Sequence, residues 1–271
     1  MDALPAIVMI TKKLKLLLIG ALWGVLSCQP DYGMSYEVVE EIQPTEVVVD
    51  SFMQPKPPEK LDVLIVVDTS CSMNDNFQQV SVGVELLRGD IEKLTLDYKI
   101  GFINSGLVIP YFAGPYDYTA DPIDFLLAPY LLGSDWYEQG FQSMYEFVTG
   151  TPEGGEFFRD DADKLIIFVS DENEQGAIPT NVFHDWLVEK FELVQHDVVA
   201  IVQLESGECP LNWEYDVGQK YIDLVAYYGK VGIDICSDWE AWLADSTFLV
   251  GELDYINLSQ TPLEDSLVVY R

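Results

Sequence analysis

The stretch that decides the fold, Leu61–Met73, reads Leu-Asp-Val-Leu-Ile-Val-Val-Asp-Thr-Ser-Cys-Ser-Met. Its first half is almost wholly apolar and rich in β-branched residues, as a central strand of a parallel sheet requires because both of its faces are covered. The apolar run ends at Asp68, and two hydroxyls follow at alternate positions, Ser70 and Ser72. One carboxylate and two hydroxyls are therefore expected on the loop that leaves a buried strand.

Oxygen ligands of this kind suit a small hard cation such as Mg²⁺, which binds few protein carboxylates and keeps several waters. Open α/β sheets bind ligands at the carboxyl ends of their strands, where Asp68 is expected. The competing interpretation is that Asp68 and the serines cap the following helix, since Asp and Ser are favoured N-cap residues. A second apolar strand, Lys164–Ser170, also ends in an acidic loop that begins with Asp171. Two such loops together favour a metal site.

Strand-like and helix-like segments alternate along the rest of the domain. Periodicity predicts helices over 77–94, 138–148, 181–195, 218–228 and 237–246, and strands over 98–104, 107–112, 198–204 and 248–253. The turn residues Ser105-Gly106 indicate a hairpin and hence an antiparallel edge strand, and 113–137 is interpreted as a long loop. This alternation predicts an α/β fold with a doubly wound, mostly parallel sheet and helices on both faces.

The pattern Asp68-x-Ser70-x-Ser72 resembles the metal-ion-dependent adhesion site (MIDAS) of von Willebrand factor type A domains, and the resemblance covers roughly residues 62–255. Asp171 stands where that family has its last site aspartate. The resemblance implies a vWA/Rossmann-like fold whose site holds Mg²⁺, or Mn²⁺ or Ca²⁺. Further stretches, at 137–141, 158–163, 218–221 and 235–239, resemble bacterial, envelope-associated members.

The second loop of the family's site normally supplies a threonine, and residues 133–140 contain none. Ser134 is the expected substitute, with Asp135 and Glu138 as alternatives. The family binds its ligands through an acidic side chain that completes the coordination of the metal, so the resemblance implies a protein partner that presents such a side chain.

Composition and motifs exclude several other functions. The formal net charge is −32, from 14 basic and 46 acidic residues, and such a surface repels nucleic acid phosphates and anionic lipid headgroups. The histidines, His184 and His196, do not form an H-E-x-x-H pair, and the chain has no G-x-S-x-G or P-loop motif. The expectation is therefore a non-enzymatic protein that does not bind nucleic acid.

The N-terminal segment, 1–27, is interpreted as an export signal. Three lysines precede the apolar run Leu16–Leu26, which is too short to span a bilayer but typical of a signal-peptide core. Val25–Cys28 resembles a bacterial lipobox, which implies lipidation of Cys28 and localisation in the bacterial cell envelope, on an outer membrane where the host has one. The alternatives are an ordinary signal peptide or an uncleaved anchor. Contact with a membrane is expected through this segment only.

The remaining organisation follows from composition. Residues 28–60 are rich in proline and predict an extended tether, within which Val47–Met53 is expected to pair onto the domain as an edge strand. The vWA-like domain is placed at 61–257, and 258–271 is a tail or a truncated β segment. A Cys209–Cys236 disulfide is predicted because exported proteins occupy compartments where disulfides persist, and two buried free thiols are the alternative.

Two other functions stay open at this stage. One is a structural or assembly component of a surface machine or virion, in which the metal is incidental. The other is an accessory subunit of a metal-handling or hydrolytic complex.

Overall fold

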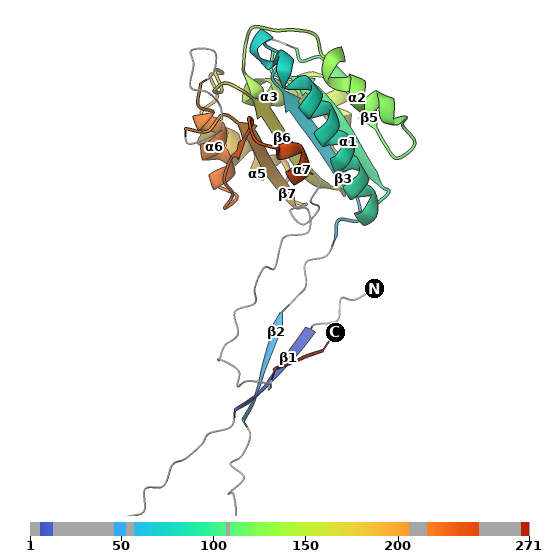
Figure 1. Cartoon of the computed structure of the whole chain (residues 1–271), viewed down its shortest axis with the longest axis vertical. Helices are drawn as coiled ribbons and strands as arrows, with labels where there is room; N and C mark the ends of the chain where they lie inside the picture. The colour runs from blue at the N-terminus through green and yellow to red at the C-terminus, as the bar shows by residue number, and fades with distance from the viewer. Residues whose placement is uncertain are drawn as a thin grey trace, which may run out of the picture. The chain divides into compact units, whose positions relative to one another are not determined.

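The computed structural model describes residues 6–12, 46–52, 57–106, 109–205, 216–243 and 267–270. The chain divides into two compact units, one formed by Met1–Pro55 with Leu253–Arg271 and the other by Lys56–Glu252 (Figure 1). The larger unit contains the predicted site residues.

A six-stranded sheet forms the centre of the larger unit, in the order β5-β4-β3-β6-β7-β8. The strands are β3 (Leu61–Val67), β4 (Tyr98–Asn104), β5 (Phe112–Tyr116), β6 (Asp163–Ser170), β7 (His196–Val202) and β8 (Ile233–Asp234). All neighbouring pairs are parallel except β4 and β5, which are antiparallel. The predicted fold class, a mostly parallel sheet with one antiparallel edge strand, is confirmed.

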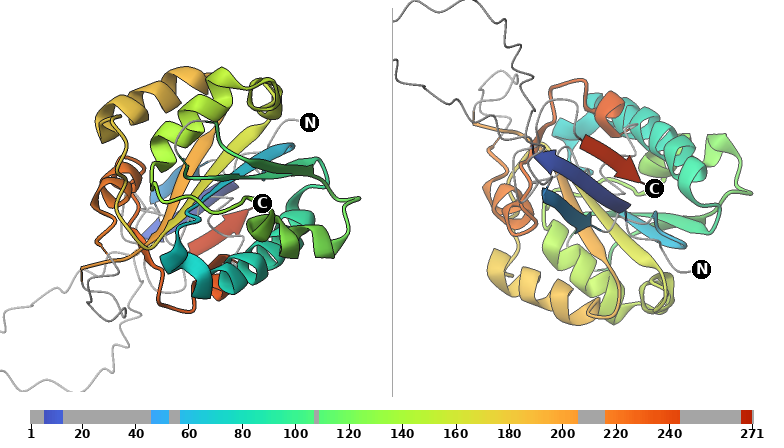
Figure 2. Two further views of the ribbon diagram at one scale, coloured as in Figure 1. Left: turned by 90° about the horizontal axis from the view of Figure 1, so that it is seen from above. Right: turned by 90° about the horizontal axis from the view of Figure 1, so that it is seen from below.

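Helices cover both faces of this sheet (Figure 2). One face carries α1 (Phe77–Leu94), α2 (Pro122–Leu131) and α7 (Trp239–Leu243), and the other α3 (Gly140–Gly150), α4 (Pro152–Phe157), α5 (Thr180–Lys190) and α6 (Gln219–Ala226). Side chains of β3 alternate between the two cores, with Val63 and Ile65 in the first and Leu64 and Val66 in the second. This two-sided burial explains why β3 is apolar from Val63 to Val67.

Several predicted boundaries differ from the structure. The interpretation of 113–137 as a loop is wrong, because it contains most of β5 and all of α2. The start of α2 is fixed locally by Asp121, whose side chain accepts a hydrogen bond from the N–H of Ile123, and by a proline at the first helical position. The edge strand begins at Phe112. The short elements α4 and β8 were not predicted, and the strand expected at 248–253 lies outside the described residues.

The smaller unit contains a three-stranded antiparallel sheet in the order β2-β1-β9. Its strands are β1 (Ala6–Lys12), β2 (Glu46–Phe52) and β9 (Leu267–Tyr270). The expectation that Val47–Met53 pairs onto the vWA-like domain is therefore wrong, since β2 pairs with β1. β1 falls within the segment interpreted as an export signal, whose apolar run and Cys28 lie outside the described residues. Export therefore stays a prediction. In the described part of the chain no helix is both long and apolar enough to cross a membrane.

Candidate metal centre

The two acidic loops meet because their strands are neighbours. β3 and β6 pair in parallel, with Val67 opposite Val169, so both chains leave the sheet at the same edge. The backbone N–H of Asp68 donates to the carbonyl of Val169 at 2.8 Å. Asp68 begins the loop that leads into the 3₁₀ helix η1 (Cys71–Asp75), and Asp171 begins the loop after β6.

A continuous set of contacts joins four of the predicted site residues. Oδ1 of Asp68 accepts a hydrogen bond from the N–H of Ser70 at 2.8 Å. The hydroxyl oxygens of Ser70 and Ser72 lie 2.8 Å apart. The Ser72 hydroxyl in turn donates to Oδ1 of Asp171 at 3.2 Å. The structure thus brings Asp68, Ser70, Ser72 and Asp171 together across two loops that are about a hundred residues apart in the chain.

Helix capping does not account for these side chains. Ser70 is the N-cap residue of η1 and Asn76 that of α1, and neither side chain makes a capping hydrogen bond. The carboxylate of Asp68 accepts from the loop and from the hydroxyl of Ser170, at 2.7 Å. These residues therefore bind one another across the sheet edge and do not cap the following helix.

The second loop places Ser134 and Glu138 in different surroundings. Ser134 is exposed, and no hydrogen bond recorded among the described residues joins it to the four residues above. The loop is tied to the first by the N–H of Asp135, which donates to the carbonyl of Thr69 at 3.4 Å. Oδ1 of Asp135 accepts from the N–H groups of Trp136 and Tyr137, at 2.7 and 3.3 Å.

The buried acid of this loop is Glu138. Its carboxylate accepts a hydrogen bond from the side-chain amide of Gln175, and its carbonyl accepts one from the Gln175 N–H at 2.7 Å. Glu138 also lies close enough to Glu172, Asp68 and Asp171 for these acids to raise its pKa. The structure therefore favours Glu138 over Ser134 as the contribution of the second loop.

Negative charge accumulates at this sheet edge. Burial raises the pKa of Asp68. Burial, followed by the charge of Asp68, raises the pKa of Asp171 to about 7. Burial, followed by a hydrogen bond with Glu172 and the charge of Asp68, raises the pKa of Glu138 to about 9. Among the ion pairs of the described residues none involves these carboxyls.

Unpartnered oxygens indicate that a ligand fits here. Asp171 is fully buried, and its Oδ2 has no hydrogen-bond partner; the buried hydroxyls of Thr69 and Ser105, in the same group of loops, have none either. Buried polar atoms without a partner are costly and rare. A divalent cation would satisfy Oδ2 of Asp171 and stabilise the ionised form of each raised carboxyl.

The donor set is that of a hard cation. No group of three or more His, Cys, Asp or Glu is placed to hold a metal within the described ranges, and the groups that link Asp68 to Asp171 are the hydroxyls of Ser70 and Ser72. Asp68, Ser70, Ser72 and Asp171 would hold the ion, with Glu138 beside them. Oxygen ligands of mixed charge suit Mg²⁺, Mn²⁺ or Ca²⁺.

Two residues of the site escaped the sequence analysis. The Ser170 hydroxyl donates to Asp68 and also contacts the carbonyl of Glu172 at 3.1 Å. Gln175, in the loop after β6 that begins with Asp171, donates a side-chain hydrogen bond to the carboxylate of Glu138. A serine at the end of a strand and a glutamine in a loop give no sequence signal of their own.

Of the cysteines, Cys71 is free and exposed. Cys209 lies outside the described residues, so its pairing with Cys236 stays a prediction.

Solved structures with a similar fold include those of a mussel byssus protein. One structure of proximal thread matrix protein 1 from the mussel byssus has a TM-score of 0.51 at 14% identity, covering 72% of this chain and 48% of that one. Another, described as having a zinc-occupied MIDAS motif, has a TM-score of 0.50 at 12% identity, covering 70% and 46%. The match thus spans about half the length of those chains. No protein-family model and no curated protein matches the sequence. At this identity the likeness shows the fold alone, and that fold is vWA/Rossmann-like.

Proposed function

We propose that this chain is a non-enzymatic domain that binds a protein partner through a divalent cation. The cation would lie where β3 and β6 end, against Asp68, Ser70, Ser72 and Asp171. The observation that carries the proposal is the fully buried carboxylate of Asp171, whose Oδ2 has no partner and whose Oδ1 is linked through Ser72 to Ser70. Mg²⁺ is the expected ion, with Mn²⁺ or Ca²⁺ as alternatives.

The ligand set suggests how the partner is bound. Two of the ligands are neutral hydroxyls, so the charge of a divalent ion would not be saturated by direct carboxylates. Such an ion attracts a further carboxylate, which the partner would supply as an Asp or Glu. The zinc-occupied MIDAS motif of the mussel byssus protein supports the proposal, since that fold accommodates a divalent cation.

The test is calorimetric titration of the full chain with MgCl₂ and with MnCl₂. Binding is expected for the unchanged protein and should be lost in Asp68→Ala, because that substitution removes the carboxylate that organises the first loop. Asp161→Ala is the matched control, since Asp161 is an exposed acid near the start of β6. Absence of binding heat for both ions, or binding that survives Asp68→Ala unchanged, would overturn the proposal.

Location is part of the same proposal. The sequence supports export and lipid anchoring to a bacterial envelope at Cys28, through the signal-like segment before it. Mass spectrometry of the protein from the membrane fraction should find a lipid on Cys28. Recovery of the chain with an intact, unmodified N-terminus would contradict it.

A structural role is the second candidate. Two of the solved structures with a similar fold belong to a matrix protein of the mussel byssus, and that name favours a scaffold in which the cation is incidental. The two functions differ in their response to chelation. A scaffold would assemble equally well in EDTA, as measured by light scattering, whereas cation-dependent binding would be abolished.

A further inference from the structure

We propose that a collar of exposed apolar side chains beside the candidate metal centre is the surface on which the partner docks. The partner would be a protein that presents an Asp or Glu flanked by apolar side chains. We define the collar as Ile109, Tyr111, Tyr130, Leu131, Trp136 and Tyr137. This inference rests on the proposed function and adds the chemistry of the residues that flank the partner's Asp or Glu.

The six side chains of the collar are all exposed to solvent. Trp136 is 79% exposed, Ile109 71% and Tyr111 64%. All six belong to two segments, the connection from β4 to β5 and the stretch that ends α2 and leads to α3. Contiguous apolar surface on a soluble protein marks an interaction site more often than an isolated apolar residue does.

Both collar segments are attached to the loop that carries Asp68. The N–H of Ser105 donates to the carbonyl of Val67 at 2.9 Å, and the N–H of Tyr111 donates to Oδ1 of Asn104 at 2.7 Å. From the other segment, the N–H of Asp135 donates to the carbonyl of Thr69. The connection from α2 to α3 passes over the edge of the sheet at which β3 ends (Figure 1).

Packing holds two of the tyrosines in place. The ring of Tyr111 lies against Gly133, where a Cβ would be 3.5 Å from it; this glycine has a φ of 74°, which other residues rarely adopt. The ring of Tyr130 meets Phe77, at the start of α1, edge to face with centroids 5.6 Å apart. Aromatic groups held in this way lose little freedom on binding, which suits them as anchors.

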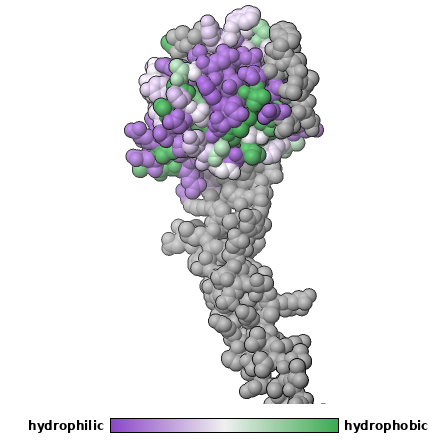
Figure 3. Space-filling view, turned by 90° about the vertical axis from the view of Figure 1, so that its left-hand side faces the viewer, coloured by the Kyte–Doolittle hydropathy of each residue, from purple (hydrophilic) through white to green (hydrophobic). Residues whose placement is uncertain are grey.

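Charge explains why the partner would approach from this side. The chain carries a net charge of −32, so most of its surface repels an incoming carboxylate. Residues 104–116 contain no charged side chain, and the stretch from Tyr130 to Tyr137 contains one, Asp135. By contrast, the face of the larger unit shown in Figure 3 is covered mostly by hydrophilic residues. The collar is therefore a charge-poor approach to the cation, and it complements an acid set among apolar groups.

The experiment is selection from a displayed library of random peptides on the immobilised full chain in MnCl₂, with elution by EDTA. The expected peptides contain an Asp or Glu next to apolar or aromatic residues. Each selected peptide is then synthesised with the acid changed to its amide, and separately with the apolar neighbours changed to serine. Both changes should lower the affinity, measured by fluorescence polarisation, at least about tenfold.

Variants of the chain complete the test. Trp136→Ser and Tyr111→Ser should each weaken the peptide about tenfold and leave Mn²⁺ affinity unchanged. Leu193→Ser is the matched control, because Leu193 is 83% exposed but lies beyond α5, before the start of β7. It should change neither affinity.

The outcomes separate the collar from the metal site. Peptides with an acid but no preference for apolar neighbours, or affinities that Trp136→Ser leaves unchanged, would overturn the collar and keep the proposed function. Absence of any EDTA-eluted peptide would overturn both. Binding of the chain to phosphatidylcholine vesicles that Trp136→Ser abolishes, with no peptide selected, would assign the collar to lipid and overturn a protein partner.

Discussion

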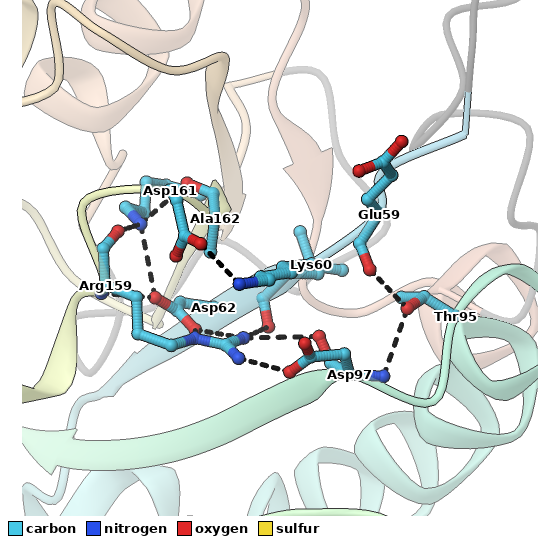
Figure 4. A network of polar contacts seen from close by, with 10 residues as sticks. Glu59, Lys60, Asp62, Thr95, Asp97, Arg159, Asp161 and Ala162 are labelled. Atoms are coloured by element: carbon cyan, nitrogen blue, oxygen red, sulfur yellow. Dashed lines mark hydrogen bonds and ion pairs between the residues drawn. The ribbon is translucent and has the colours of Figure 1, made fainter. Parts of the chain in front are cut away.

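Asp62 lies at the start of β3 and Asp68 directly after its end, and the groups that surround their carboxylates differ in charge. At the start of β3, Oδ1 of Asp62 accepts from Nε of Arg159 and Oδ2 from its backbone N–H, both at 2.7 Å, and Nζ of Lys164 lies 3.2 Å from Oδ2 (Figure 4). At the other end, Asp68 meets only hydroxyls and a backbone N–H. One buried acid thus has protein cations beside it, and the other has further acids.

The network around Asp62 shows what a buried carboxylate requires for stability. Lys164 also donates to the carbonyl of Ala162 at 2.7 Å, and Arg159 reaches the carboxylate of Asp97. Burial lowers the pKa of Lys164, and the charge of Asp62 opposes that shift. The network joins β3, β4 and the turn before β6, so its role is structural.

Among the residues that the structure describes, no comparable ion pair neutralises the other end of the strand. Residues 100–158, which include the entire second loop, contain no lysine or arginine. Keeping Asp68, Asp171 and Glu138 together without a basic partner is costly in the absence of a cation. This difference is the one expected if the proposed cation occupies the second end.

The largest expected effect is a loss of folding stability when Asp62, at the start of β3, is replaced. Asp62→Ala leaves the buried ammonium of Lys164 without its carboxylate and should lower the free energy of unfolding by about 3–5 kcal/mol. Urea denaturation measures it, with Asp161→Ala as a control expected to have a much smaller effect because its pair with Lys60 is exposed. Equal effects of the two substitutions would remove the distinction between the ends.

A smaller gain is expected when the other end receives its ion. Mn²⁺ at about a hundred times its dissociation constant should raise the free energy of unfolding by about 2.7 kcal/mol, since it binds only the folded chain. Asp171→Asn should abolish the gain, and Asp97→Asn, in the Asp62 network, should keep it. A gain of the same size in both variants would mean that the ion binds elsewhere.

The pH dependence of the metal-free chain distinguishes the ends further. The ordinary pKa values of Asp171 and Glu138 are 3.8 and 4.5, and in the folded chain they are raised to about 7 and about 9. The folded chain therefore binds more protons than the unfolded chain between about pH 4 and pH 9. Its free energy of unfolding should fall as pH rises through that window, by up to about 1.4 kcal/mol per pH unit for each proton.

Denaturation in EDTA at pH 5, 7 and 9 measures this fall in the free energy of unfolding. Glu138→Gln should reduce the fall between pH 7 and pH 9. Affinity for the cation should rise over the same window, because the ion binds the ionised carboxylates. A slope that Glu138→Gln leaves unaltered would assign the fall to general charge repulsion.

The smallest expected effect separates two residues of one loop. Glu138→Gln should lower Mn²⁺ affinity about tenfold, or about 1.4 kcal/mol, because the carboxylate that it removes is buried beside the site. Ser134→Ala should change nothing, because its hydroxyl is exposed. Titration calorimetry on both variants decides between them; the reverse result would restore Ser134 as the ligand.

Sequence patterns could predict the sheet because its central strands are buried on both faces, and this leaves long apolar runs at β3 and β6. They could not predict α2, whose two prolines and apolar surface do not follow an amphipathic period. Asp68 and Asp171 could be found because each follows the end of such a strand, and Ser70 and Ser72 because they follow Asp68 at alternate positions. Glu138 could not be preferred over Ser134, because the choice depends on a contact with Gln175, far along the chain, that no local pattern encodes.

Crystals of the full chain soaked in MnCl₂ test the central claim most directly, through the anomalous signal of the metal. An anomalous peak is expected within coordination distance of the hydroxyls of Ser70 and Ser72 and the carboxylates of Asp68 and Asp171. A map with no peak at this sheet edge, or with Oδ2 of Asp171 bonded to a protein group that excludes the ion, would contradict it.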